Sequence, residues 1–177
     1  RLADTSAISR IWSRDVSLWP DTPGTRETVR DRLGWLDAPA MATAHLDRMA
    51  AAHEAAIADG FDHVVLLGMG GSSLAPDVIA RVLAPAVGRT SLRMLDSVAP
   101  VAVRRAFTDI RRALVVVASK SGSTIEPTVL ALEARRQLES AGVSAWPHHF
   151  VAITDPGTSL STAAVDERFR DVWLNPA

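Results

Sequence analysis

Short apolar runs alternate with longer amphipathic segments along the chain from residue 61 onward. Five runs have the length of strands, and four segments between them have helical spacing. The runs lie at 63–67, 91–95, 113–118, 149–153 and 171–174, and the helical segments at 73–84, 99–109, 124–140 and 158–164. The runs 63–67 and 113–118 are continuously apolar, as in strands covered by helices on both faces. The pattern predicts an α/β fold with a doubly wound, five-stranded parallel sheet.

Right-handed crossovers limit the order of these strands, and 2-1-3-4-5 is the most economical arrangement. In that order the loops after the first and third strands flank the point where the strand order reverses. Ligands bind at this point in open α/β sheets. The sequence therefore predicts one pocket between the two loops.

Residues 1–60 have a different pattern, with helical spacing in 25–36 and 41–58 and prolines between the segments. Trp12, Trp19 and Trp35 are large apolar side chains suited to packing. We expect residues 1–60 to form a helical N-terminal extension that docks on a domain of residues 61–177.

Composition removes several classes of function. The 177 residues carry a net charge of −1, so the chain has no net positive field to hold nucleic acid or an anionic membrane. The absence of cysteine excludes disulfides and thiolate chemistry. No apolar run approaches the roughly 20 residues of a membrane helix. The first residues show no signal-peptide pattern, and because the sequence begins at Arg1 we expect it to be part of a longer protein.

The candidate chemistry lies in the two loops that follow the apolar runs. Residues 68–73 read Gly-Met-Gly-Gly-Ser-Ser, and residues 119–124 read Ser-Lys-Ser-Gly-Ser-Thr. A strand that ends in small residues and passes into a helix offers backbone N–H groups and the positive end of the helix dipole to an anion. Two such loops at one sheet edge predict a single phosphate site built from both.

The first loop has two other interpretations. Gly68-x-Gly70-x-x-Ser73 is similar to a dinucleotide fingerprint without its third glycine, and Asp96 would stand for the ribose-binding acid of a nicotinamide-dependent enzyme. The second alternative is a tight turn without a ligand. A P-loop is excluded because no Gly-Lys-Ser/Thr follows at the required spacing.

The second loop contains four hydroxyl residues and the only lysine of the chain, Lys120. Ser123-x-x-Glu126 has the spacing of a capping box, which predicts that Ser123 caps the following helix. Ser119, Lys120, Ser121 and Thr124 then remain for a ligand. The alternative here is a polar turn that only starts a helix.

The two loops together carry a family resemblance. Residues 66–76 resemble the first signature of phosphoglucose isomerases, and residues 119–127 resemble the second, which is shared with the wider sugar isomerase (SIS) domain class. Residues 154–158 and 169–176 fit later segments of the same domain. The combination is most similar to the isomerase half of bifunctional transaldolase–phosphoglucose isomerase proteins.

This resemblance implies interconversion of glucose 6-phosphate and fructose 6-phosphate in the cytoplasm, with no metal or organic cofactor. The family's phosphate-binding positions correspond to Gly71, Ser72, Ser119, Lys120, Ser121 and Thr124. The family's catalytic glutamate, histidine, arginine and lysine belong to segments that would follow Ala177. The expected partners are therefore a sugar phosphate and the C-terminal half of the isomerase.

No catalytic residue is predicted within the chain. His45 and His53 are expected on one face of a helix, and His148 and His149 on opposite faces at the start of a strand. The main alternative function is a non-catalytic sugar-phosphate-sensing SIS module of a regulator. Such a regulator is expected to carry a basic helix-turn-helix segment, and residues 1–60 have no such charge pattern.

Overall fold

The protein is described by a computed structural model that covers residues 6–83 and 90–175. The chain divides into two compact units, Arg1–His53 and Glu54–Ala177. The division falls within one helix, α4 (Leu46–Ala58). In the described ranges, no helix is long and apolar enough to cross a membrane.

The described part of the first unit is helical. Its other elements are α1 (Ala7–Trp12), η1 (Val16–Leu18), α2 (Thr25–Arg32), η2 (Leu33–Asp37) and α3 (Ala38–Ala44). The rings of Trp12 and Trp35 pack at 6.4 Å between centroids, although both residues keep about 60% of their surface exposed.

The segments with helical spacing at 25–36 and 41–58 are each divided between two helical elements in the structure. The backbone N–H of Leu33 bonds to the carbonyl of Arg30, three residues back, which tightens the end of α2 into the 3-10 helix η2. The N–H of His45 likewise bonds to the carbonyl of Ala42, so α3 ends there and α4 begins at Leu46. His45 and His53 therefore do not share one continuous helix.

The second unit contains a five-stranded parallel sheet of order β2-β1-β3-β4-β5, which confirms the predicted topology. The strands are β1 (His63–Gly68), β2 (Ser91–Leu95), β3 (Ala113–Ala118), β4 (Phe150–Thr154) and β5 (Asp171–Leu174). The helices are α5 (Gly71–Leu83), α6 (Pro100–Ala106), α7 (Ile125–Ser140) and α8 (Ser159–Asp166), with short turns η3 (Ile110–Arg112) and η4 (Trp146–His149).

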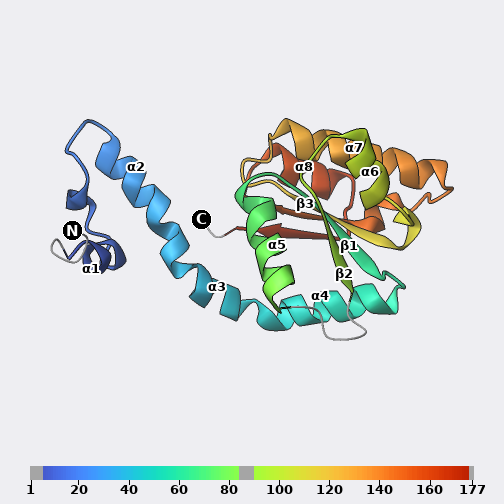
Figure 1. The fold of residues 1–177 in the computed structure, drawn as a ribbon, viewed down its shortest axis with the longest axis horizontal. Helices are drawn as coiled ribbons and strands as arrows, with labels where there is room; N and C mark the ends of the chain where they lie inside the picture. Colours follow the sequence, from blue (N-terminus) through green and yellow to red (C-terminus); the bar gives the residue numbers. More distant parts are fainter. Residues whose placement is uncertain (1–5, 84–89, 176–177) are drawn as a thin grey trace. The chain divides into compact units, whose positions relative to one another are not determined.

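Helices cover both faces of this sheet (Figure 1). α6, α7 and α8 lie on one face, and α5 lies on the other beside β1 and β2. The main core is on the first face, where Leu67 and Val115 are completely buried and pack with Leu130 and Leu138 of α7. Full burial of each such side chain contributes about 1.5–3 kcal/mol, so this layer holds β1 and β3 in register.

The apolar run predicted at 149–153 begins its strand one residue later. His148 and His149 belong to η4, because Pro147 at its first turn favours a helical turn over an extended strand. The prediction that these histidines open a strand and point to opposite faces is therefore wrong.

Candidate functional site

Two loops leave the sheet side by side at its carboxyl edge. β1 and β3 are hydrogen-bonded neighbours in which Gly68 pairs with Ala118. Met69 and Ser119 are thus the first residues beyond two aligned strand ends, about 5 Å apart across the ladder. The register of the sheet brings the two loops to one place.

The first loop turns tightly into α5. Gly70 has a positive φ of 56°, a conformation that glycine adopts without a steric penalty. The buried Ser73 hydroxyl donates to the carbonyl of Gly70 at 3.0 Å, and the N–H of Leu74 bonds to the same carbonyl. These bonds fix the first turn of α5, with Gly71 and Ser72 at its N-terminal end.

The second loop folds back on itself before α7. The N–H of Gly122 bonds to the carbonyl of Ser119 at 3.1 Å. The hydroxyl of Ser119 donates to that of Thr124 at 3.3 Å, which brings the two ends of the loop together. Ser119 is buried, whereas Lys120 and Ser121 are exposed.

The predicted capping box at the start of α7 is wrong. The N-cap is Thr124, and its side chain makes no capping bond. The hydroxyl of Ser123 donates instead to the hydroxyl of Ser121 at 3.2 Å. The first N–H groups of α7 therefore have no side-chain cap, and the N-terminal end of the helix keeps its free donors and its positive dipole.

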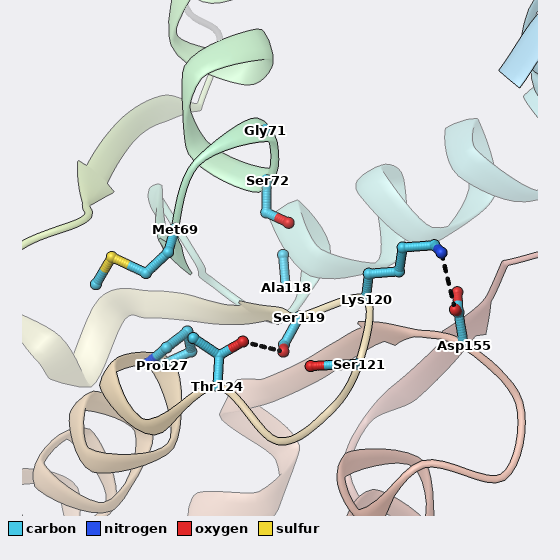
Figure 2. A pocket seen from close by; sticks show the side chains of 10 residues that line it. All are labelled: Met69, Gly71, Ser72, Ala118, Ser119, Lys120, Ser121, Thr124, Pro127 and Asp155. Carbon is cyan, nitrogen blue, oxygen red and sulfur yellow. Dashed lines mark hydrogen bonds and ion pairs between the residues drawn. The ribbon is translucent and has the colours of Figure 1, made fainter. Parts of the chain in front are cut away.

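One pocket of about 560 Å³ lies between the two loops, within the range of roughly 300–1,000 Å³ typical of small-molecule sites. Its walls come from both loops, from the first turns of α5 and α7, and from the residue after β4 (Figure 2). The lining residues are Met69, Gly71, Ser72, Ala118, Ser119, Lys120, Ser121, Thr124, Pro127 and Asp155.

The structure brings all six predicted site residues to this pocket: Gly71, Ser72, Ser119, Lys120, Ser121 and Thr124. Met69, Ala118, Pro127 and Asp155 were missed. Asp155 follows β4 and joins the site because Ile153 pairs with Ala118, an alignment that only the sheet order predicts. Asp96 is not among the lining residues, so the acid of the dinucleotide interpretation does not line this pocket.

The charges of the pocket are one lysine and one aspartate. The Nζ atom of Lys120 lies 3.6 Å from Oδ2 of Asp155, and the Asn175 side chain donates to Oδ1 of the same carboxylate at 2.7 Å. Lys120 is 84% exposed, so this ion pair contributes at most about 1 kcal/mol. An incoming anion is therefore able to recruit the ammonium group at small cost.

None of the described histidines lines this pocket. His63 begins β1, at the far end of the strand from the first loop, and is buried against Asp62. The Nδ1–H of His149 donates to the carbonyl of Ala113 at 3.0 Å, at the start of β3. Burial lowers the pKa of His149, which stabilises its neutral form.

The described residues also include no cluster of three or more His, Cys, Asp or Glu side chains able to hold a metal ion. The arrangement instead has the features of an anion site. Two helix N-termini, several hydroxyl groups and one exposed lysine converge on a small pocket, and such a set donates hydrogen bonds to a phosphate group.

Comparisons with known proteins point to one family. The family model for phosphoglucose isomerase matches residues 44–171. Glucose-6-phosphate isomerase of Thermosynechococcus vestitus is 33% identical over 165 residues, which cover 89% of this chain and 29% of the relative. The isomerase of Acaryochloris marina is 32% identical over 164 residues, covering 90% of this chain and 30% of the relative.

Two solved structures have the same fold. A hypothetical protein of Thermus thermophilus superposes with a TM-score of 0.73 at 26% identity, over 99% of this chain and 40% of that protein. A glucose-6-phosphate isomerase of Chlamydia trachomatis superposes with a TM-score of 0.65 at 22% identity, over 93% of this chain and 30% of the isomerase. The chain spans about a third of the length of the curated relatives that it matches. With the family model matched over most of its residues, the chain belongs to the phosphoglucose isomerase family.

Proposed function

We propose that this chain supplies the sugar-phosphate-binding part of a glucose-6-phosphate isomerase. The observation that carries the proposal is the pocket between the first and second loops, lined by all six residues predicted from the family signatures. In this proposal residues 61–177 are an SIS-type domain and residues 1–60 a helical extension. A cytoplasmic location and a preceding transaldolase half remain expectations from the resemblance.

The phosphate group binds at the two helix N-termini in this proposal. Gly71 and Ser72 contact it from α5, and Ser119, Ser121 and Thr124 contact it from the second loop, while Lys120 closes over it. Hydrogen bonds to a charged acceptor contribute about 1.5–3 kcal/mol each, and association costs about 4 kcal/mol or more. Three or four contacts then give a dissociation constant between millimolar and tens of micromolar.

The chain binds the substrate in this proposal and does not turn it over. Isomerisation of an aldose to a ketose requires a base that removes a proton next to the carbonyl. Asp155 is the one carboxylate among the lining residues of this pocket, and it is occupied by Lys120 and Asn175 beside the phosphate loops. The base therefore comes from the rest of the isomerase.

A titration of the chain with glucose 6-phosphate tests the binding site. The double variant Ser121→Ala/Thr124→Ala removes two pocket hydroxyls, and we expect its affinity to fall at least tenfold. Thr128→Ala is the matched control, since this hydroxyl lies one turn further along α7 and donates to the carbonyl of Thr124. Equal affinity in the double variant and the unmodified chain would contradict the site assignment.

An activity assay tests the second half of the proposal. The purified chain is expected to convert glucose 6-phosphate no faster than the buffer blank. If the chain showed turnover above background and Asp155→Asn abolished it, the base would be Asp155. The proposal that the base comes from the rest of the isomerase would then be wrong.

A further inference from the structure

A third loop, residues 154–159, lies next to the second loop and is hydrogen-bonded to it. The N–H of Ser119 bonds to the carbonyl of Ile153 at 3.0 Å, which continues the ladder between β3 and β4 by one step. The N–H of Asp155 bonds to the carbonyl of Lys120 at 3.1 Å. The first two residues of the second loop are therefore fixed by the end of β4.

The turn of the second loop is held by the first turn of α8. The Ser159 hydroxyl donates to the carbonyl of Gly122 at 2.6 Å, 37 residues away in the chain. Neither residue lines the pocket. This bond joins the turn between Ser121 and Thr124, two pocket residues, to the N-terminus of α8.

The same turn packs against Thr158 without space for a side chain. Gly122 has a φ of 64°, and a Cβ atom built on it would lie 2.5 Å from Cβ of Thr158. The Thr158 hydroxyl is itself fixed, because it contacts the Thr154 hydroxyl at 2.8 Å and accepts from the N–H of Ser161. The close packing on Thr158 and the hydrogen bond from Ser159 together restrict the movement of the turn.

We propose that Ser159 is a positioning residue for the phosphate site, acting through the carbonyl of Gly122 and the close packing of that glycine on Thr158. This inference rests on the proposed function, since it assigns the second loop to phosphate. A ligand gains most from donors that are already held in place, because ordering a loop on binding costs affinity. Ser159 therefore sets the affinity without touching the ligand.

The test compares Ser159→Ala with Ser161→Ala in the whole chain. Both serines lie in the first turn of α8, but the Ser161 hydroxyl donates locally to the carbonyl of Thr158 at 2.7 Å. We expect Ser159→Ala to bind inorganic phosphate about fivefold more weakly, the factor that corresponds to one ordinary hydrogen bond. Ser161→Ala is expected to bind within twofold of the unmodified chain, and Ser159→Thr, which keeps the hydroxyl, to recover the affinity.

Hydrogen exchange of the Gly122 amide gives a second readout that needs no ligand. This N–H bonds within the loop to the carbonyl of Ser119, and we expect it to exchange about fivefold faster in Ser159→Ala than in Ser161→Ala. Equal exchange and equal affinity in the two variants would overturn the role of Ser159. Faster exchange together with no phosphate binding by the unmodified chain would support the loop contact and refute the proposed function instead.

Discussion

Replacement of Gly122 by alanine is the sharpest perturbation that the structure offers. The added Cβ atom would lie 2.5 Å from Cβ and 2.7 Å from Oγ1 of Thr158, and the residue has a φ of 64°. Gly142 is a matched control within the same unit. Its φ is 79°, and a Cβ atom there would meet nothing within 4 Å.

The two variants separate backbone strain from the steric clash. A left-handed conformation costs an alanine about 1–2 kcal/mol, and the restricted unfolded chain returns about 0.4–1 kcal/mol. Gly142→Ala should therefore lower the free energy of unfolding by about 1 kcal/mol. Overpacking adds about 1–3 kcal/mol, so Gly122→Ala should lower it by about 2–4 kcal/mol.

Unfolding in urea, followed through the amide signals of β1 and β3 by NMR, reports on this unit alone. A phosphate titration of the same samples should show weaker binding only for Gly122→Ala. If both variants lost the same stability, the contact between Gly122 and Thr158 would not exist as described. The explanation of how the second loop is held would then be wrong.

Three further predictions concern the stability of the second unit. Leu67→Ala should lower the free energy of unfolding in urea by about 2–5 kcal/mol, because Leu67 is completely buried. Leu132→Ala, at a position that is 59% exposed, should lower it by less than about 0.5 kcal/mol. Burial lowers the pKa of His149 below its ordinary 6.5, so the unfolded chain takes up the proton first. The free energy of unfolding should therefore be highest above pH 6.5 and decrease as the pH falls below it. Urea unfolding measured at a series of pH values should show a smaller decrease for His149→Gln than for the unmodified chain. Arg136 lowers the pKa of Glu133 from 4.5 to about 2, so the stability that this ion pair contributes should be lost as the pH falls from 4.5 to 2. Glu133→Gln should remove this pH dependence and lower the free energy of unfolding by about 0.2–0.5 kcal/mol at neutral pH. If the pH dependence of stability were unchanged in His149→Gln or in Glu133→Gln, the pKa shift assigned to that residue would be contradicted.

The sheet was predictable because its signals are local and strong. The continuous apolar runs around Val65 and Val115 are long enough for buried strands, and their spacing leaves room for one helix in each crossover. The strand order then places the ends of β1 and β3 together. For the same reason the pocket could be predicted from two loops that lie about 50 residues apart in the sequence.

Details that depend on competing hydrogen bonds were not predictable. Ser123 has the spacing of a helix cap, but its hydroxyl donates to the hydroxyl of Ser121 instead. The helix predicted through His45 ends there because its N–H bonds three residues back. Both outcomes are decided by differences of about 1 kcal/mol between local bonds, which residue spacing does not resolve.

The contribution of the third loop was missed for a different reason. Asp155 and Ser159 meet the second loop only through the pairing of β3 with β4, where Ile153 aligns with Ala118. A serine in the first turn of a helix has no sequence feature that indicates a bond to a carbonyl 37 residues away. Such contacts become visible only when the register of the sheet is known.

The central claim is that the first and second loops bind one phosphate group together. The most direct measurement is an NMR titration of the chain with glucose 6-phosphate, following the backbone amides of both loops. We predict that the signals of Gly71 and Ser72 shift with the same dissociation constant as those of Ser121 and Thr124. Shifts confined to one loop, or different constants for the two loops, would contradict the claim.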